Sequence, residues 1–207
     1  MPSIFLKEDR NQTIMVWRIV EPLSFFLDRL PLDETDLPST YPERNAQWLA
    51  ARYLLHVVID QPEILKDNHQ KPYLANDLRY ISISHSFEVA AIMVADKPCG
   101  IDIEKDLPRL QRIATKFILP EDLPRLRSGP NYNDHLYTIW CAKEAMFKAY
   151  GLGSVNFKNH LTLDLEAIMR GDPSFNGALI NESVSLQFKL NYEQIDQQYH
   201  LVYGALK

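Results

Sequence analysis

The chain has 207 residues, of which 46% are apolar and 24% charged, and its formal net charge at pH 7 is −5. This length fits one large domain or two small ones, and the two cysteines, Cys99 and Cys141, are too few for a disulfide framework. The negative charge argues against a nucleic-acid-binding face, and no apolar run reaches the roughly 20 residues that cross a bilayer. We therefore expect a soluble cytoplasmic protein that binds neither nucleic acid nor membrane.

The first elements are predicted from β-branched runs, helical periodicity and proline content. They are a strand over 14–20, a short helix over 22–30, a loop over 32–41 and a helix over 42–59. Pro42 suits the first turn of that last helix, and Ser39 or Thr40 is its expected cap.

The remaining elements follow from the same signals. They are strands over 80–86, 89–95 and 100–104, a helix from 108 to 117 or 118, a long helix over 134–150, and an antiparallel pair over 184–190 and 200–206. Gly151 and Gly153 end the long helix, because glycine readily adopts the left-handed conformation of a C-terminal cap. Each half runs from helix to paired strands, which predicts an α/β fold with an N-terminal half, 1–97, and a C-terminal half, 98–207. No sequence repeat decides whether the halves are two copies of one unit.

Two acids alternate on the predicted strand over 100–104. Side chains two residues apart share a face of a strand, so Asp102 and Glu104 point to the same side, roughly 7 Å apart. Two carboxylates on one face repel unless water surrounds them or a cation lies between them. Oxygen ligands favour a hard cation such as Mg²⁺. The alternative is an edge strand with one solvated face.

A third acid interrupts an apolar stripe on the long helix. At 100° per residue, Trp140, Glu144 and Phe147 fall within one narrow arc. An ionised carboxylate there is costly unless it is paired or bound to metal. Glu144 either pairs with Lys143, Lys148 or an arginine, or joins Asp102 and Glu104 in a three-carboxylate Mg²⁺ site.

These segments resemble a known family. The run Gly-Ile-Asp-Ile-Glu over 100–104, followed by Trp-Cys-Ala-Lys-Glu-Ala-Met-Phe-Lys-Ala-Tyr-Gly over 140–151, is similar to the paired signature of 4′-phosphopantetheinyl transferases. The chain length favours the monomeric type that resembles the surfactin-synthetase activator. Two further segments match in order, Lys-Pro-Tyr-Leu over 71–74 and Ile-Ser-His-Ser over 83–86. Gln70 stands where the family usually has glycine, and Ser82 where it has asparagine.

The resemblance implies a pseudo-twofold α/β fold with coenzyme A (CoA) in the cleft between two similar subdomains. It also implies roles for individual residues. Asp102, Glu104 and Glu144 would hold Mg²⁺, or Mn²⁺, on the CoA pyrophosphate. The phosphates would face Lys143 and Lys148. The nucleotide end, with its 3′-phosphate, would contact Lys71, Ser84 and His85, helped by Arg44 or Arg52. Glu121 corresponds to an acid that has been considered part of the site.

The implied reaction transfers the phosphopantetheine arm of CoA to a serine of an acyl or peptidyl carrier protein and releases 3′,5′-ADP. Glu144 is the first candidate for the base that takes the serine proton, and Glu121 the second. Lys148 is the candidate for neutralising the departing phosphate. Basic residues Arg109, Arg112 and Lys116 on the helix after 108 form either a docking patch for an acidic carrier or a solvated face.

Other enzyme classes fit the sequence less well. Ser84 and His85 are neighbours on a strand and point to opposite faces, so they do not form the nucleophile and base of a hydrolase. The chain also lacks a nucleophile elbow, a zinc spacing and a P-loop. Two alternatives to the transferase stay open: a non-catalytic CoA- or nucleotide-binding protein, and a Mg²⁺-dependent hydrolase of a pyrophosphate. The sequence does not identify the carrier or its pathway.

Overall fold

The computed structural model describes residues 3–207, and the chain divides into two compact units, Met1–Asp96 and Lys97–Lys207. Both units combine helices with antiparallel sheets, so the predicted α/β class is confirmed. Among the described residues, no helix has both the length and the apolar character needed to cross a membrane.

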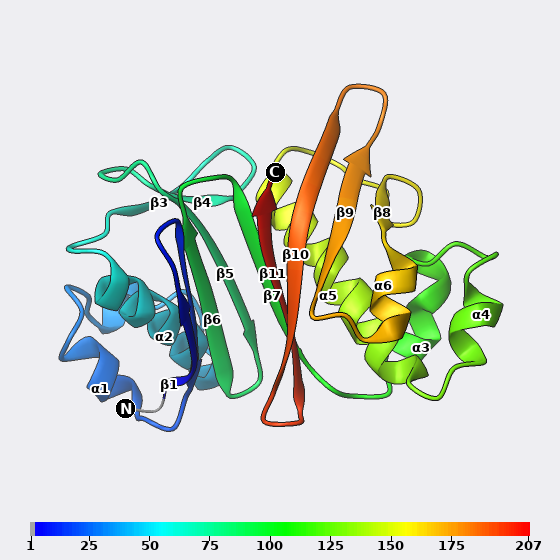
Figure 1. Cartoon of the computed structure of the whole chain (residues 1–207). Helices are drawn as coiled ribbons and strands as arrows, with labels where there is room; N and C mark the ends of the chain where they lie inside the picture. The colour runs from blue at the N-terminus through cyan, green and yellow to red at the C-terminus, as the bar shows by residue number, and fades with distance from the viewer. Residues whose placement is uncertain (1–2) are drawn as a thin grey trace. The chain divides into compact units, whose positions relative to one another are not determined.

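The first unit packs one long helix on a four-stranded sheet of order β1-β2-β6-β5 (Figure 1). Its elements are β1 (Ser3–Glu8), β2 (Gln12–Arg18), α1 (Leu23–Leu27), the 3₁₀ helix η1 (Glu34–Asp36), α2 (Pro42–Val58), β3 (Ile64–Lys66), β4 (Pro72–Leu74), β5 (Tyr80–Ser86) and β6 (Val89–Ala95). Every residue of β6 is buried, and Ala90, Ile92 and Val94 belong to the core that α2 helps to form.

The core of the first unit explains why α2 lies on this sheet. Leu49, Ala50 and Leu54 repeat at helical spacing and are fully buried against Trp17 of β2 and Ile92 of β6. Burying an aliphatic side chain of this size stabilises the fold by about 1.5–3 kcal/mol. The expected cap at Ser39 or Thr40 is wrong, because Tyr41 is the N-cap and makes no side-chain capping bond.

The second unit is built on a five-stranded antiparallel sheet of order β7-β11-β10-β9-β8, with the long helix α5 packed against it (Figure 1). Its elements are β7 (Cys99–Lys105), α3 (Leu110–Ile113), the 3₁₀ helix η2 (Ala114–Lys116), α4 (Leu123–Arg127), α5 (Tyr132–Tyr150), β8 (Leu161–Leu163), α6 (Leu165–Arg170), β9 (Ser174–Ile180), β10 (Ser185–Ile195) and β11 (Tyr199–Leu206).

Helix α5 is buried on two sides. Leu136, Ile139 and Met146 lie in a core with Phe188 and Val202 of the sheet. Gly151 ends the helix with a φ of 70°, the left-handed cap that its position predicts.

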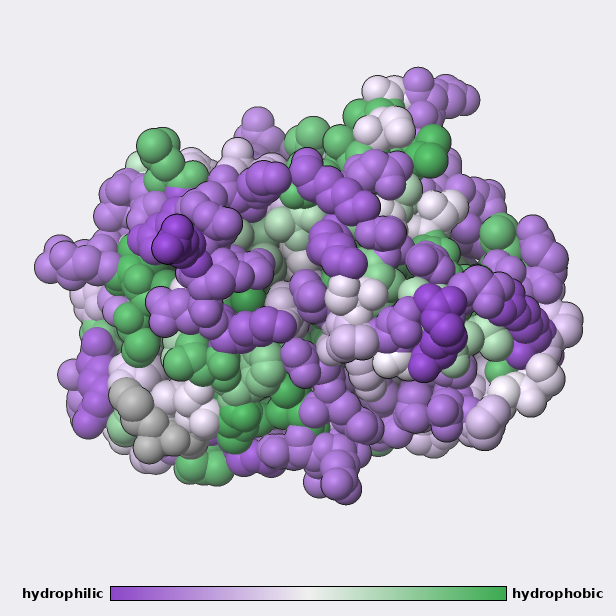
Figure 2. Space-filling view, viewed as in Figure 1, coloured by the Kyte–Doolittle hydropathy of each residue, from purple (hydrophilic) through white to green (hydrophobic). Residues whose placement is uncertain are grey.

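The segment after β7 is less regular than predicted. In place of one helix from 108 to 118, a single α-helical turn, α3, leads into η2. Neither piece has a side-chain cap. Figure 2, viewed as in Figure 1, shows that mostly hydrophilic side chains cover the surface in the region of α3 and α4.

Candidate active site

Strand β7 approaches the backbone of α5 unusually closely at one residue, Gly100. A Cβ atom at this position would lie 1.8 Å from the carbonyl oxygen of Ala145 and 3.0 Å from the amide nitrogen of Ala149. Only glycine fits there, because any side chain would overlap the helix backbone. Residues 100, 102 and 104 alternate onto the same face of β7, so this glycine brings Asp102 and Glu104 towards the helix.

Asp102 meets the helix through an ion pair. The ammonium of Lys148 lies 2.8 Å from Oδ1 of Asp102 and also donates to the carbonyl of Ile101 at 3.0 Å. Asp102 is buried, with only 6% of its surface exposed, and the Ile101 and Ile103 side chains on the other face are fully buried. The alternative of an edge strand with a solvated acidic face is therefore wrong at Asp102, although β7 does lie at one edge of its sheet.

The charges of Asp102 and Glu104 on β7 act on Glu144. Its pKa is raised to about 7, first by burial and then by the negative charges of Asp102 and Glu104, while Lys148 opposes the rise. Glu144 therefore lies close enough to Asp102 and Glu104 for their charges to act on it. A carboxyl group whose pKa is raised beside two other acids is typical of a functional site or of a structural ion-pair network.

Glu104 forms an ion pair with Arg109, a residue that the sequence placed in a docking patch. Its Oε2 lies 2.5 Å from a guanidinium nitrogen of Arg109, at the start of α3. Arg109 is one of the three residues of the expected docking patch, and its side chain stays about half exposed in this ion pair. Arg112 and Lys116 are exposed and stay available for docking.

Two further residues of the predicted set lie apart from these ion pairs. Lys143 is buried, and its ammonium donates to the carbonyls of Phe117 at 2.7 Å and Phe157 at 2.6 Å. Burial lowers its pKa to about 8. The predicted contact of Lys143 with phosphate does not fit this position, because the ammonium already donates two hydrogen bonds to backbone carbonyls of its own unit. Glu121 is exposed in the turn that precedes α4.

In the first unit, Lys71 follows a tight turn that departs from the family pattern at Gln70. The carboxylate of Asp67 accepts hydrogen bonds from the amides of His69 at 2.8 Å and Lys71 at 3.0 Å. Gln70 adopts a φ of 66°, in the left-handed region that favours glycine. The turn that a glycine would make is therefore retained, at the cost of backbone strain at Gln70.

Ser84 and His85 lie near the end of β5 and point to opposite faces, as predicted. Ser84 is buried and His85 is exposed. The turn after β5 contains Phe87, which has a φ of 51° and whose carbonyl accepts a hydrogen bond of 2.7 Å from the side chain of Gln47 on α2. This bond ties the turn beside His85 to the helix that carries Arg44 and Arg52.

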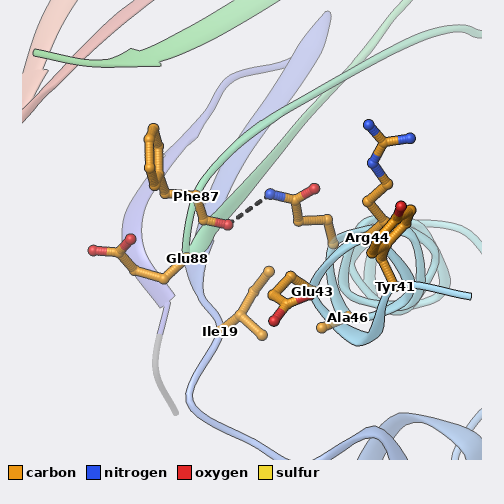
Figure 3. Close-up of a pocket in the computed structure, with 8 residues that line it drawn as sticks. Ile19, Tyr41, Glu43, Arg44, Ala46, Phe87 and Glu88 are labelled. Atoms are coloured by element: carbon orange, nitrogen blue, oxygen red, sulfur yellow. Dashed lines mark hydrogen bonds between the residues drawn. The ribbon is translucent and has the colours of Figure 1, made fainter. Parts of the chain in front are cut away.

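The two arginines of α2 differ in their surroundings. Arg44 is exposed and lines a cavity of about 870 Å³ with Tyr41, Gln47 and Phe87 (Figure 3). The guanidinium carbon of Arg52 lies 3.4 Å from the centre of the Trp48 ring, and burial lowers the pKa of Arg52 to about 10. Arg44 is therefore the arginine with the open surroundings that an anionic ligand requires.

A second polar cluster was not predicted from the sequence. Asp106, Asp134 and His200 place one ligand atom each within 4.8 Å of the others. Burial lowers the pKa of His200, although Asp106 and Asp134 oppose this. His200 on β11 lies opposite Glu104 on β7 in the register of the two strands. Only this long-range strand pairing reveals the cluster.

The donor set of the first site suits a hard divalent cation. Asp102, Glu104 and Glu144 offer oxygen ligands only, which Mg²⁺ and Mn²⁺ prefer. Burial and the charges of the other two acids raise the pKa of Glu144, and a nearby cation would favour its ionised form. The residues present therefore fit the metal that the sequence predicts.

Comparison with known proteins gives three matches. A family model described as the 4′-phosphopantetheinyl transferase superfamily matches residues 98–203, slightly more than half of the chain. A 4′-phosphopantetheinyl transferase of Bacillus subtilis is 36% identical over 86 residues, which cover 40% of this chain and 38% of that protein. The 4′-phosphopantetheinyl transferase gsp of Aneurinibacillus migulanus is 28% identical over 123 residues, which cover 57% of this chain and 52% of that protein. The chain thus matches about half or less of the length of these relatives.

Proposed function

Because the chain belongs to the 4′-phosphopantetheinyl transferase superfamily, we propose that it transfers the phosphopantetheine arm of CoA to a serine of an apo acyl or peptidyl carrier protein. One observation carries the proposal. Burial and the charges of Asp102 and Glu104 raise the pKa of Glu144, which supports a site shared by three carboxylates from a strand and a helix. Both segments lie within the matched region.

In the proposed reaction, the serine oxygen of the carrier attacks the phosphorus next to the pantetheine. The new bond joins that oxygen to phosphorus, and the bond to the bridging oxygen of the pyrophosphate breaks. The products are the phosphopantetheinylated serine and 3′,5′-ADP, which keeps the bridging oxygen.

Three carboxylates would serve as metal ligands in this step, and one of them is also the candidate base. Asp102, Glu104 and Glu144 would hold Mg²⁺ or Mn²⁺, which when bound would supply positive charge beside the pyrophosphate. Glu144 is also the first candidate for the base that takes the serine proton. Exposed Glu121 is the second candidate for that base.

Lys148 would neutralise charge on the departing phosphate. Its ammonium is paired with Asp102 at 2.8 Å. Lys143, in contrast, holds two carbonyls of its own unit and is given no part in the reaction.

We propose that the nucleotide end of CoA contacts Lys71, Ser84 and His85, with Arg44 rather than Arg52 as the helping arginine. Arg44 lines an open cavity, whereas Arg52 is stacked on Trp48. Kinetics with CoA and dephospho-CoA, which lacks the 3′-phosphate, test this assignment. Arg44→Ala should raise KM for CoA towards that for dephospho-CoA, and Arg52→Ala should raise both equally.

The activity is tested by mixing the protein with CoA, Mg²⁺ and a panel of apo carriers, and measuring the intact mass of each carrier. We expect one carrier or more to gain a single phosphopantetheinyl group. Glu144→Ala should abolish that gain, whereas Glu166→Gln, at an exposed glutamate paired with Arg125, should retain it.

The same assay separates the alternatives. Release of phosphopantetheine from CoA without any carrier would indicate a pyrophosphate hydrolase. Tight CoA binding with no modified carrier in the panel would indicate a non-catalytic CoA-binding protein. Near-normal transfer by Glu144→Ala would remove Glu144 from the reaction.

A further inference from the structure

Three side chains from separate segments of the second unit converge beside the end of β7. Asp106 follows β7, Asp134 lies in the first turn of α5, and His200 lies on β11. Nε2 of His200 is 3.9 Å from Oδ2 of Asp106 and 4.0 Å from Oδ1 of Asp134. The imidazole therefore points between two carboxylates that belong to other elements.

His200 is held rigidly in this orientation. Its side chain is fully buried, and its ring stacks on Tyr137 with the ring centres 4.8 Å apart and the planes 10° apart. Nδ1 lies 2.9 Å from the hydroxyl of Tyr192. Among the described residues, Nε2 has no hydrogen-bond partner. A buried nitrogen without a hydrogen bond costs free energy, and a bound ion would remove that cost at Nε2.

The surroundings of His200 match those of a metal-binding histidine. Such a ring uses one nitrogen for the metal and donates the other N–H to a neighbouring acceptor. The Tyr192 hydroxyl can accept from Nδ1–H, which leaves the Nε2 lone pair directed between the two carboxylates. Asn133 donates to the other oxygen of Asp106 and so orients that carboxylate as well.

The spacing of the three atoms fits a small cation. They lie within 4.8 Å of one another, and a point equidistant from three atoms so spaced is about 2.3–2.5 Å from each. Zinc bonds to nitrogen and carboxylate oxygen are about 2.0–2.2 Å, so a closure of a few tenths of an ångström suffices. Asp106 and Asp134 can make that movement, because their side chains are 38% and 49% exposed.

We propose that Asp106, Asp134 and His200 form a second divalent-cation site, distinct from the three-carboxylate site and selective for Zn²⁺ over Mg²⁺. The selectivity follows from the imidazole, which suits transition metals, whereas Mg²⁺ prefers oxygen ligands. A cation here links the segment that follows Glu104 to both α5 and β11. The site is independent of the transferase proposal, since it needs neither CoA nor a carrier.

The test uses the tag-free protein with Zn²⁺ alone and with Mg²⁺ alone. The chain has six histidines, and ¹⁵N-labelled histidine resolves the two ring nitrogens of each by NMR. His200 is identified by its contacts with the stacked Tyr137 ring. We expect one equivalent of Zn²⁺ to shift Nε2 of His200, and Mg²⁺ at the same concentration to leave it unchanged.

Variants assign the ligands. Asp106→Asn and Asp134→Asn should each weaken Zn²⁺ binding at His200 on the order of 100-fold or more, since even outer partners of a metal contribute about 10–100-fold. Asp172→Asn, at a partly exposed aspartate paired with Arg170, is the matched control and should bind Zn²⁺ normally. Glu144→Gln should also retain the His200 response.

Two results would overturn the proposal. An unchanged His200 spectrum in excess Zn²⁺ would mean that the imidazole simply lies between two carboxylates. Loss of the response in Glu144→Gln with retention in Asp134→Asn would assign the ion to the three-carboxylate site instead.

Discussion

Replacing Gly100 with alanine tests how the site is assembled. The added Cβ would lie 1.8 Å from the Ala145 oxygen, whereas ordinary contacts begin at 3.4 Å, so strand and helix must separate by about 1.6 Å. Overpacking a core typically costs about 1–3 kcal/mol, and here the neighbour is backbone, which cannot change rotamer. We therefore expect Gly100→Ala to lower the free energy of unfolding by about 3 kcal/mol or more.

Urea unfolding followed by circular dichroism measures this loss, and Mn²⁺ binding measures its effect on the site. A helix displaced by this much would break the 2.8 Å pair between Asp102 and Lys148 and move Glu144 away from β7. The matched control is Gly129→Ala, where the nearest atoms to a new Cβ lie at 3.5 and 4.0 Å. That variant should change stability by about 0.5 kcal/mol or less. Equal stability of Gly100→Ala and Gly129→Ala would refute the close approach of β7 and α5.

Three further predictions concern single positions. In the metal-free protein, the pKa of Glu144 lies near 7 instead of its ordinary 4.5, so stability should fall by about 3 kcal/mol as pH rises from 4.5 to above 7, because the folded state holds the proton more tightly. Glu144→Gln should lack that fall in urea unfolding, and parallel pH profiles would contradict the assignment. Gln70→Gly should raise the unfolding free energy by roughly 0.5–1 kcal/mol by relieving the positive φ, and a loss of stability would show that the turn is unstrained. Charge reversal at both Arg112 and Lys116 should raise the KM for an acidic carrier but not for CoA, and an unchanged carrier KM would exclude docking there.

Local patterns in the sequence predicted much of the fold. Helical periodicity predicted α2 and α5, and Gly151 predicted the end of α5. Strands β5 and β6 have the bounds that were predicted. The helix expected from 108 to 118 is broken into α3 and η2. Eight short elements were missed, namely η1, α4, α6, β1, β3, β4, β8 and β9. The strands among them depend on sheet pairing rather than on local pattern.

The site was predictable only where its residues lie close together in the chain or alternate on one strand. Strand alternation placed Asp102 and Glu104 on one face, and the apolar stripe marked Glu144 as unusual. The buried ammonium of Lys143 could not be foreseen, because its two carbonyl partners lie 26 and 14 residues away. The position of His200 beside Glu104 depends on the register of β7 and β11, which no local pattern reveals.

The central claim is that Asp102, Glu104 and Glu144 hold one divalent cation on the pyrophosphate of CoA. It is tested most directly by ³¹P NMR of CoA bound to excess protein while Mn²⁺ is added, because paramagnetic relaxation falls steeply with distance. We predict that the pyrophosphate signals relax faster than the 3′-phosphate signal in the native protein and that Glu144→Gln removes the difference. Equal relaxation of all three phosphorus atoms, or an unchanged pattern in Glu144→Gln, would contradict the claim.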